Sequence, residues 1–273
     1  MRTTLVKLTD GRLPFVAAGH EVWTSLEGEN PGGSIKDRMV EAELRAAVAR
    51  GELEPGSLVT EISAGSTARS LAYFAREMGF GCELFVPHSI KEELKASLSS
   101  LGARLHLVDP ASAYAEYDAY CASRKPWRLD QMQRVGLKDH YTSWAARDLK
   151  PRLGRIDAVI GSVGTGHSLL GIARALDPRS GPVAAEPTEA KAIPGIRNLH
   201  LERYPGDPCS KEDFSSRIEV AREDFCPFPD LQSDLGRIVF SDSFRVALAA
   251  TATHLRSLPP NRVFILGSHN RAA

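Results

Sequence analysis

A lysine follows a glycine-rich turn near the start of the chain, in the run Asn30-Pro-Gly-Gly-Ser-Ile-Lys36-Asp-Arg38. The turn is expected to lead directly into a helix and to bring Lys36 close to exposed backbone amides. A lysine amine forms an imine with an aldehyde when its surroundings favour the neutral amine, a condition that burial can supply. An isolated lysine after a loop is more commonly a solvated surface residue. Lys36 alone therefore does not indicate a cofactor site, and its interpretation depends on the other motifs in the sequence.

Small hydroxyl residues occupy a second segment, from Glu61 to Ala68, where an apolar strand ends and a helix is expected to begin near Thr67. Free amides at a helix start, together with hydroxyl groups, suit a carboxylate ligand. The alternative is an ordinary Ser/Thr cap that serves only the helix. The residues in question are Ser63, Ala64, Gly65, Ser66 and Thr67.

A third segment, again rich in glycine, lies between an apolar strand and an apolar helix. It runs Gly161-Ser-Val-Gly-Thr-Gly-His-Ser168, and this arrangement is typical of a phosphate held on backbone amides. A dinucleotide fold is the alternative, because Glu186 follows Gly166 by about 20 residues and lies just after the next expected strand. Leu169 stands where the last glycine of GxGxxG would fall, which weakens the dinucleotide interpretation.

Short apolar runs alternate with helical patterns along most of the chain, which predicts βαβ units around a mostly parallel sheet. A first helix is expected to begin near Lys36 and to end before the Gly- and Pro-containing stretch at 51–56. The segment 186–235 is interrupted by prolines and is expected to be rich in loops. The expected strands are 58–62, 83–86, 104–108, 158–161, 183–185 and 262–266, and the later helices are 67–78, 90–99, 114–122, 168–176 and 244–257.

Taken together, the three segments resemble the fold-type II pyridoxal-phosphate enzymes, a family that includes cysteine synthase, cystathionine β-synthase and the serine/threonine dehydratases. The run ending at Arg38 is similar to that family's cofactor-lysine motif, the hydroxyl-rich segment to its substrate-carboxylate loop, and the third segment to its phosphate cradle. Three motifs in the family's order are far more specific than any one alone. Gly65-Ser-Thr67 with Ala72-Tyr-Phe-Ala75 is similar to a bacterial cysteine synthase/desulfhydrase branch.

The resemblance implies an α/β fold like that of the tryptophan synthase β chain, with two lobes whose mostly parallel twisted sheets are flanked by helices. Residues 1–36 together with 145–273 would form the larger, cofactor-binding lobe. Residues 37–144 would form the smaller lobe, which closes over the substrate. The family commonly forms homodimers, and we expect one here.

Pyridoxal 5'-phosphate is the cofactor that the resemblance implies, bound to Lys36 as an internal aldimine. Lys36 would then be displaced by the substrate amine and act as the base that removes the α-proton. Loss of a β-substituent would give an aminoacrylate, and we expect β-replacement on an activated L-serine or an L-cysteine. The alternatives are β-elimination, as in a cysteine desulfhydrase or a serine/threonine dehydratase, and a regulatory protein that binds the cofactor with little activity.

The same resemblance implies two sets of binding residues. The cofactor would be bound by Lys36, Ser66, Gly164, Thr165, Gly166, His167, Ser168 and Ser268, the last at the pyridine nitrogen. The substrate carboxylate would be bound by Ser63, Ala64, Gly65, Ser66, Thr67 and Gln131. Three residues depart from the family pattern, since Ser66 replaces the usual asparagine, His167 a common glycine, and Phe244 the glycine of a small-residue turn.

Composition limits the other classes of function. Lys+Arg and Asp+Glu are both 34 in 273 residues, so the formal net charge is zero and no basic face indicates nucleic acid or an anionic membrane. The four cysteines form no CxxC pair and the histidines no HxxxH or HExxH pair, so neither a metal site nor a disulfide framework is expected. No run of about 18 apolar residues occurs. We expect a cytoplasmic protein whose partners are a small amino-acid substrate and a small nucleophile.

Overall fold

The computed structural model describes residues 1–8, 13, 19–189, 193, 195–202, 206–225, 231–233, 236–256, 258–259, 261–267 and 269–271. Contacts between Cα atoms divide the chain into two compact units, one of Met1–Asn30 with Val135–Ala273 and the other of Pro31–Arg134. Both boundaries lie earlier in the chain than those expected at 36/37 and 144/145, and Lys36 belongs to the smaller unit. The functions expected of the two lobes stay predictions.

The larger unit is built on a six-stranded sheet in the order β1-β2-β12-β7-β8-β9. β1 is antiparallel to β2, and the other neighbouring pairs are parallel. Its strands are β1 (Leu5–Lys7), β2 (Glu21–Ser25), β7 (Ala158–Ser162), β8 (Pro182–Pro187), β9 (Ser216–Val220) and β12 (Arg262–Leu266). A separate antiparallel sheet consists of β10 (Leu231–Ser233), β11 (Gly236–Phe240) and β13 (His269–Arg271), in the order β10-β11-β13.

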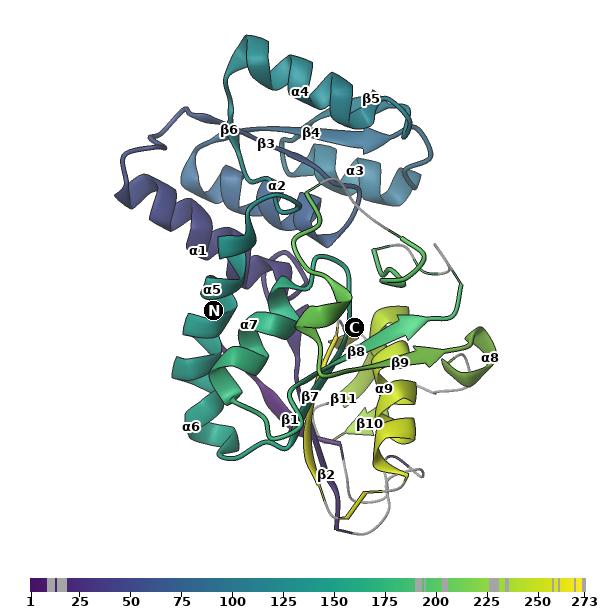
Figure 1. Ribbon diagram of the computed structural model, residues 1–273. Helices are drawn as coiled ribbons and strands as arrows, with labels where there is room; N and C mark the ends of the chain where they lie inside the picture. The colour runs from purple at the N-terminus through teal and green to yellow at the C-terminus, as the bar shows by residue number, and fades with distance from the viewer. Residues whose placement is uncertain are drawn as a thin grey trace. The chain divides into compact units, whose positions relative to one another are not determined.

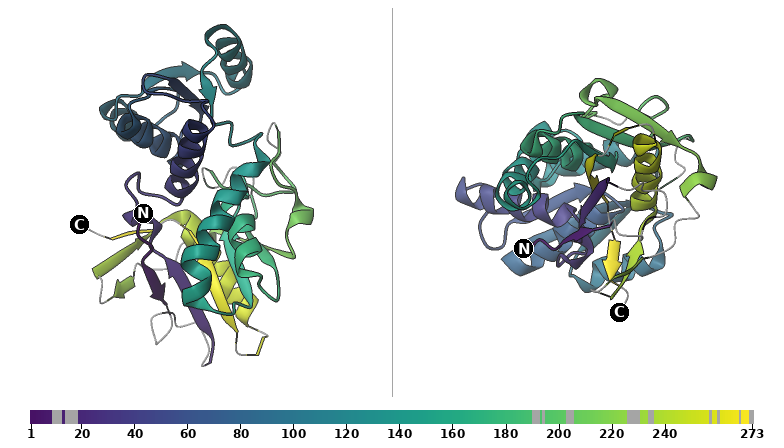
Figure 2. Two further views of the ribbon diagram at one scale, coloured as in Figure 1. Left: turned by 90° about the vertical axis from the view of Figure 1, so that its left-hand side faces the viewer. Right: turned by 90° about the horizontal axis from the view of Figure 1, so that it is seen from below.

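Helices cover both faces of the six-stranded sheet (Figure 1, Figure 2). Side chains alternate between the faces of a strand, so Ile160 packs in the core beneath α9, whereas Gly161 faces Leu169 of α7. The described helices of this unit are α5 (Lys138–Trp144), α6 (Lys150–Leu153), α7 (His167–Leu176), α8 (Arg222–Phe225) and α9 (Asp242–Leu255). Shorter helical turns are η1 (Glu27–Glu29), η2 (Val135–Leu137), η4 (Lys211–Asp213) and the π-helical η3 (Ala145–Leu149) between α5 and α6.

The smaller unit has a four-stranded, fully parallel sheet in the order β5-β4-β3-β6. Its helix α4 packs on the sheet through a cluster that includes Phe85, Val108 and Tyr117, and its helices α1 and α2 pack against each other. The strands are β3 (Leu58–Ile62), β4 (Gly81–Pro87), β5 (Arg104–Val108) and β6 (Trp127–Arg128). The helices are α1 (Lys36–Ala49), α2 (Ser66–Met78), α3 (Glu92–Ser100) and α4 (Ala113–Arg124).

The expected α/β architecture with mostly parallel sheets is confirmed. The strands expected at 58–62, 104–108 and 262–266 coincide with β3, β5 and β12. The segment 186–235 holds more regular structure than expected, because its described part contains β9 and α8. β9 lies at the edge of its sheet and only Val220 among its residues is buried, so its sequence carries little apolar signal.

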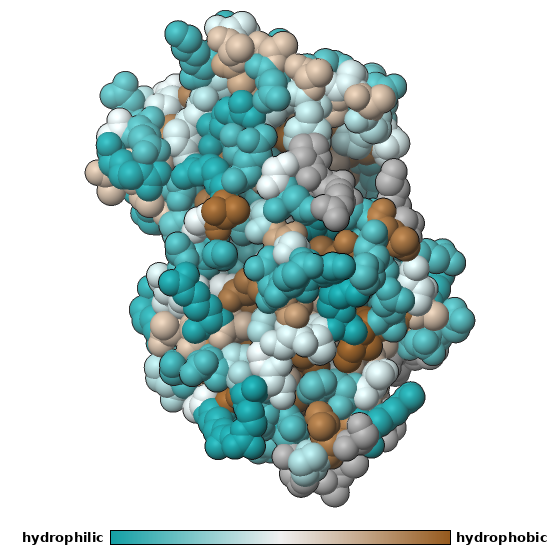
Figure 3. Space-filling model, in the orientation of Figure 1, coloured by the Kyte–Doolittle hydropathy of each residue, from teal (hydrophilic) through white to brown (hydrophobic). Residues whose placement is uncertain are grey.

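Hydrophilic residues cover most of the face shown in Figure 3. The large apolar side chains that are exposed in the described part of the chain come from separate segments, and they are Met1, Val48, Leu107, Val135 and Leu201. Isolated exposed apolar residues of this kind are normal on a protein surface. Within the described ranges, no helix has the length and apolar character needed to cross a bilayer.

Candidate active site

The glycine-rich turn before Lys36 is held by the side chain of Asp37. Helix α1 begins at Lys36, whose backbone N–H donates to Ser34 Oγ at 3.1 Å. The buried Asp37 carboxylate accepts the N–H of Gly32 at 2.6 Å, and a Cβ added to Gly32 would overlap Asp37 Oδ1. This close approach requires glycine. The turn thereby fixes the point from which the Lys36 side chain extends.

Asp37 also connects the two helices of the smaller unit that carry the predicted site residues. Its Oδ1 accepts a short hydrogen bond from the Ser70 hydroxyl of α2, and both side chains are fully buried. A buried carboxylate that accepts two hydrogen bonds is strongly fixed in position. The start of α1, with Lys36, and the first turns of α2, with Thr67, are therefore tied together.

The amine of Lys36 lies beside the side chain of Gln131, with Nζ donating to Oε1 at 3.4 Å. Burial lowers the pKa of Lys36 from 10.5 to about 8, and the nearby Glu61 carboxyl acts in the opposite direction. With a pKa of about 8, roughly a tenth of the amine is neutral at pH 7, against less than about one in a thousand at its ordinary value. The neutral amine is the form that attacks an aldehyde.

The side chains of Thr67 and Lys36 both donate to the same amide oxygen, Oε1 of Gln131. Thr67 Oγ1 donates to Gln131 Oε1 at 2.8 Å, and both residues are buried. Helix α2 begins after Gly65 without a side-chain cap, so the Thr67 hydroxyl is engaged with Gln131 and not with the first amides of the helix. This geometry differs from that of a residue that only caps a helix.

The rest of the hydroxyl-rich segment is more open to solvent. Ala64, Gly65 and Ser66 are exposed, whereas Ser63 is half-buried and its Oγ accepts the N–H of Gly65 at 3.4 Å. Helix α2 is 13 residues long, and the first amides of such a helix carry partial positive charge. An exposed helix start beside the buried Thr67–Gln131 pair can accept a carboxylate.

In the larger unit, the turn between β7 and α7 contains two glycines, Gly164 and Gly166, whose positions leave no room for a side chain. Helix α7 is ten residues long and begins after Gly166, which has φ +78°. A Cβ on Gly164 would lie 2.6 Å from Gly195 O, and one on Gly166 would lie 2.6 Å from Cys209 Sγ. Both positions therefore require glycine. Backbone amides at such a helix start suit a phosphate dianion.

The other residues predicted at this turn differ in their exposure. Thr165 and His167 are buried, and Ser168 is half-buried at the start of α7. His167, which stands where the family commonly has glycine, has only 1% of its surface exposed. Its ring is therefore packed into the larger unit and does not project into solvent over the turn.

A buried arginine that the sequence analysis did not identify supports this turn. Arg197 is fully buried, its Nε donates to Gly164 O at 2.8 Å, and its backbone N–H donates to Val163 O at 2.9 Å. Its Nη1 forms an ion pair with Asp207, and its Nη2 donates to the carbonyl of Cys209 at 3.1 Å. One guanidinium group thus joins three chain segments around the glycine turn.

Three further residues named in the sequence analysis differ in what the structure shows of them. Ser268 lies outside the described residues. Phe244 is fully buried in α9. Glu186 is also fully buried, and its Oε2 accepts the N–H of Leu199 at 3.1 Å and pairs with Arg217 at 3.3 Å. A carboxyl engaged in this way is not positioned to meet a ribose, which counts against the dinucleotide interpretation.

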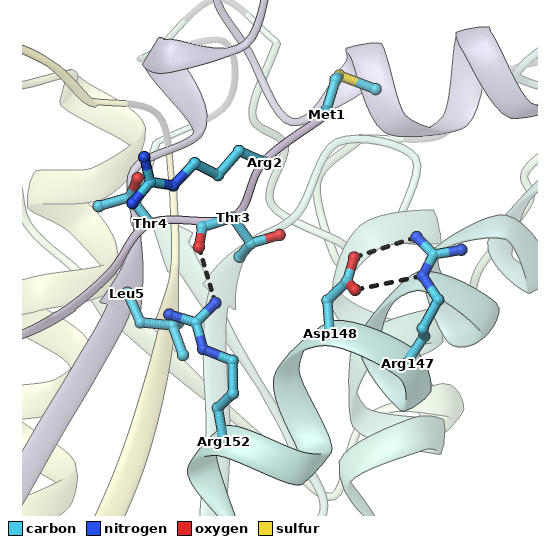
Figure 4. Close-up of a pocket in the computed structure, with 8 residues that line it drawn as sticks. All are labelled: Met1, Arg2, Thr3, Thr4, Leu5, Arg147, Asp148 and Arg152. Atoms are coloured by element: carbon cyan, nitrogen blue, oxygen red, sulfur yellow. Dashed lines mark hydrogen bonds and ion pairs between the residues drawn. The ribbon is translucent and has the colours of Figure 1, made fainter.

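A hollow of about 600 Å³ lies elsewhere in the larger unit, lined by residues 1–5 and by Arg147, Asp148 and Arg152 (Figure 4). Arg147 pairs with Asp148 at 3.1 Å, and Arg152 Nη1 donates to Thr3 O at 2.7 Å. These charged groups are already bonded to neighbouring residues. No predicted site residue lines the hollow. In the described part of the chain, His, Cys, Asp and Glu also form no group of three that could hold a metal ion.

The family model described as "Pyridoxal-phosphate dependent enzyme" matches residues 2–242. The chain belongs to this family. Cysteine synthase B of Escherichia coli strain K12 is 33% identical over 196 residues, which cover 69% of this chain and 65% of that protein. The chain therefore spans less than two thirds of this relative's length. Cysteine synthase of Aquifex aeolicus is 29% identical over 226 residues, covering 75% of this chain and 69% of that protein.

Solved structures of low sequence identity share the fold. An O-acetylserine dependent cystathionine β-synthase from Helicobacter pylori aligns with a TM-score of 0.84 at 19% identity, over 98% of this chain and 92% of that chain. O-ureido-L-serine synthase aligns with a TM-score of 0.81 at 18% identity, over 97% and 88%. At these identities the likeness concerns the fold, and it confirms the fold-type II architecture expected from the sequence.

Pyridoxal phosphate is the cofactor of this family, and the described residues offer groups that fit its two ends. The Lys36 amine, with its lowered pKa, suits the aldehyde. The bare turn from Gly164 to Gly166 at the start of α7 suits the phosphate. The chain thus carries the donor set that the cofactor requires.

Proposed function

We propose that this pyridoxal-phosphate enzyme catalyses β-replacement on an activated L-serine, such as an O-acylated serine, or on an L-cysteine. The observation that carries the proposal is the shared oxygen of Gln131, which joins the cofactor lysine Lys36 to Thr67 in the loop assigned to the substrate carboxylate. A lysine and an amino-acid carboxylate site held together are what proton removal at Cα requires. The names of the matched relatives, both cysteine synthases, support the same reaction.

The proposal assigns different residues to the two ends of the cofactor. Lys36, at the start of α1, would hold the aldehyde end, and the backbone amides at the start of α7 would hold the phosphate. When bound, the cofactor supplies an electron sink that stabilises negative charge at Cα of the substrate. The residues assigned to the phosphate are Gly164, Thr165, Gly166, His167 and Ser168, and those assigned to the ring are Ser66 and Ser268.

The substrate carboxylate is assigned to the exposed start of α2 and to Gln131. Because Gln131 Oε1 accepts hydrogen bonds from Lys36 and Thr67, its amide nitrogen is the end that donates to a carboxylate. Lys36 Nζ, with a pKa of about 8, takes the proton from Cα near neutral pH and returns a proton later. The other residues assigned to the carboxylate are Ser63, Ala64, Gly65, Ser66 and Thr67.

Product analysis tests the proposed reaction. The holoenzyme is incubated with O-acetylserine and sulfide, with O-phosphoserine and sulfide, and with L-cysteine and a second thiol. We expect a new β-substituted alanine together with release of the original β-substituent. Pyruvate and ammonia as the main products would indicate β-elimination instead. A protein that binds the cofactor but forms no product from any of these amino acids would contradict the proposal and favour a regulatory role.

Thr67→Val tests the assignment of the carboxylate loop. Valine keeps the shape of the side chain but removes the hydroxyl that donates to Gln131, so we expect KM for the amino acid to rise about tenfold or more, with a smaller loss in kcat. Thr251→Val is the matched control, because the Thr251 hydroxyl is also buried but bonds only to Ala247 O within α9. Equal KM values for the two variants would return Thr67 to a purely structural role.

We also propose that the chain forms a homodimer in the cytoplasm and acts on small molecules, not on nucleic acid or a membrane. The described cysteines Cys82, Cys121 and Cys209 are free thiols, which accords with a reducing compartment. Light scattering across the working concentration range is expected to give twice the mass of one chain. A monomer throughout that range would contradict the dimer without affecting the cofactor assignment.

A further inference from the structure

A buried glutamate stands at the end of strand β3, next to the residues assigned to the substrate. Glu61 is fully buried, its Oε2 accepts the N–H of Gln131 at 3.1 Å, and its Oε1 accepts the N–H of Ile62 at 3.1 Å. Both oxygens of the carboxyl are therefore engaged with backbone amides. The whole arrangement lies within the smaller unit.

The carboxyl of Glu61 accepts a backbone amide just beyond the end of strand β6. Strand β6 pairs with β3 as far as Arg128, and the N–H of Leu129 donates to Thr60 O at 3.1 Å. Asp130 then adopts φ +49°, a left-handed conformation that turns the chain away from the ladder. The next amide, that of Gln131, donates to the Glu61 side chain.

The side chain of Gln131 extends from this anchored turn to the two predicted site residues. Its Oε1 accepts hydrogen bonds from Lys36 Nζ at 3.4 Å and from Thr67 Oγ1 at 2.8 Å. We propose that Glu61 is a positioning residue, which fixes the turn at Gln131 so that one amide oxygen holds Lys36 and Thr67 in the arrangement that the amino-acid substrate requires. The role of the substrate in this inference rests on the proposed function, whereas the anchoring of the turn does not.

The surroundings of Glu61 shift the pKa of its carboxyl. Burial and the nearby Asp130 raise the pKa of Glu61 to about 8, while the two amide donors and Lys36 oppose the shift. A raised pKa of this kind means that the ionised carboxylate is disfavoured at this position relative to the neutral acid. A buried ionisable side chain with a shifted pKa is a candidate for function when it also contacts a site by hydrogen bonds, as Glu61 does through the Gln131 N–H.

Substitution of Glu61 separates this role from simple packing. Glu61→Gln keeps the size of the side chain but puts an amide N–H₂ where one of the two backbone N–H groups needs an acceptor. We expect the apparent Kd of the holoenzyme for L-alanine, which has no β-substituent to lose, to rise about fivefold or more in a spectral titration. Glu83→Gln on the neighbouring strand β4 is the control, because Glu83 bonds to His106 and Tyr120 and not to Gln131.

A double-mutant cycle shows whether Glu61 acts through Gln131. Gln131→Met removes the shared oxygen but leaves the backbone amide that Glu61 binds, so in this background Glu61→Gln is expected to add little to the rise in Kd. Effects that multiply in the double variant, or a Glu61→Gln variant with unaltered affinity, would overturn the proposal. If Glu61→Gln does not fold, Glu61→Asp replaces it, and its shorter carboxyl is expected to weaken alanine binding in the same way. Unaltered affinity in that variant would also overturn the proposal.

Hydrogen exchange of the protein without cofactor distinguishes failure of this inference from failure of the proposed function. In Glu61→Gln, or in Glu61→Asp if that variant replaces it, the amides of residues 129–133 are expected to exchange faster than in the parent protein, because the Gln131 N–H loses its acceptor. This result is independent of any amino-acid substrate. If L-alanine does not bind the parent holoenzyme, the proposed function is wrong, and the exchange rates still decide whether Glu61 anchors the turn. Unchanged exchange at 129–133 would overturn that anchoring.

Discussion

Replacing Lys36 with alanine is expected to lower turnover of the best amino-acid substrate by at least about 10³-fold and to abolish covalent retention of pyridoxal phosphate. The amine is assigned two roles, because it bonds the aldehyde of the cofactor and takes the proton from Cα. Its hydrogen bond to Gln131 and its lowered pKa place it where both roles can be performed near neutral pH. Steady-state kinetics and the visible spectrum after gel filtration measure the two losses.

Lys91→Ala provides the matched control for this experiment. Lys91 is an exposed lysine of the same smaller unit, directly before α3. Its loss is expected to leave the spectrum and turnover unchanged, because exposed side chains away from a site contribute little. A Lys36→Ala variant with turnover within about tenfold of the parent would show that another group performs the proton transfer.

Replacing Arg197 with methionine is expected to lower the free energy of unfolding by about 3–5 kcal/mol, because it leaves the partners of a fully buried charged group without their donor. Those partners include Gly164 O in the glycine turn and the carboxylate of Asp207. Because we propose that this turn binds the cofactor phosphate, we also expect cofactor affinity to fall. Urea denaturation measures the first effect, and titration of the cofactor-free protein measures the second.

Arg174→Met is the control for the loss of an arginine. Arg174 pairs with Asp139 at 2.8 Å, but both side chains are more than half exposed, so the expected loss is less than about 1 kcal/mol. If Arg197→Met were as stable as Arg174→Met and retained the cofactor, the guanidinium would not support the turn. An unstable Arg197→Met that kept full cofactor affinity would confine the role of Arg197 to folding.

The sequence predicted most of the elements around the candidate site, because the apolar strands in the interior of each sheet carry a strong signal. Strand β3 has the bounds that the sequence predicted. Helix α7 begins one residue earlier than expected. Helix α5 was not predicted, although it packs against α7 so closely that a Cβ on Gly171 would overlap the carbonyl of Lys138. Its short and polar sequence carries no clear helical period.

The motifs predicted which residues belong to the candidate site but not how they meet. Gln131 lies 95 residues after Lys36 and 64 after Thr67, and nothing in the sequence indicates that its one oxygen accepts from both. Glu61 and Arg197 were missed because their partners include backbone groups from distant segments. The available signal was a charged residue inside an apolar stretch, as in Leu58-Val-Thr-Glu-Ile62.

Borohydride reduction of the holoenzyme, followed by peptide mapping, shows which lysine carries the cofactor. Reduction fixes the cofactor to the amine that holds it, and mass spectrometry identifies that residue. We expect a single pyridoxyl group on Lys36, at the start of α1 and beside Gln131. Attachment to a different lysine, or a purified protein that takes up no pyridoxal phosphate, would contradict it.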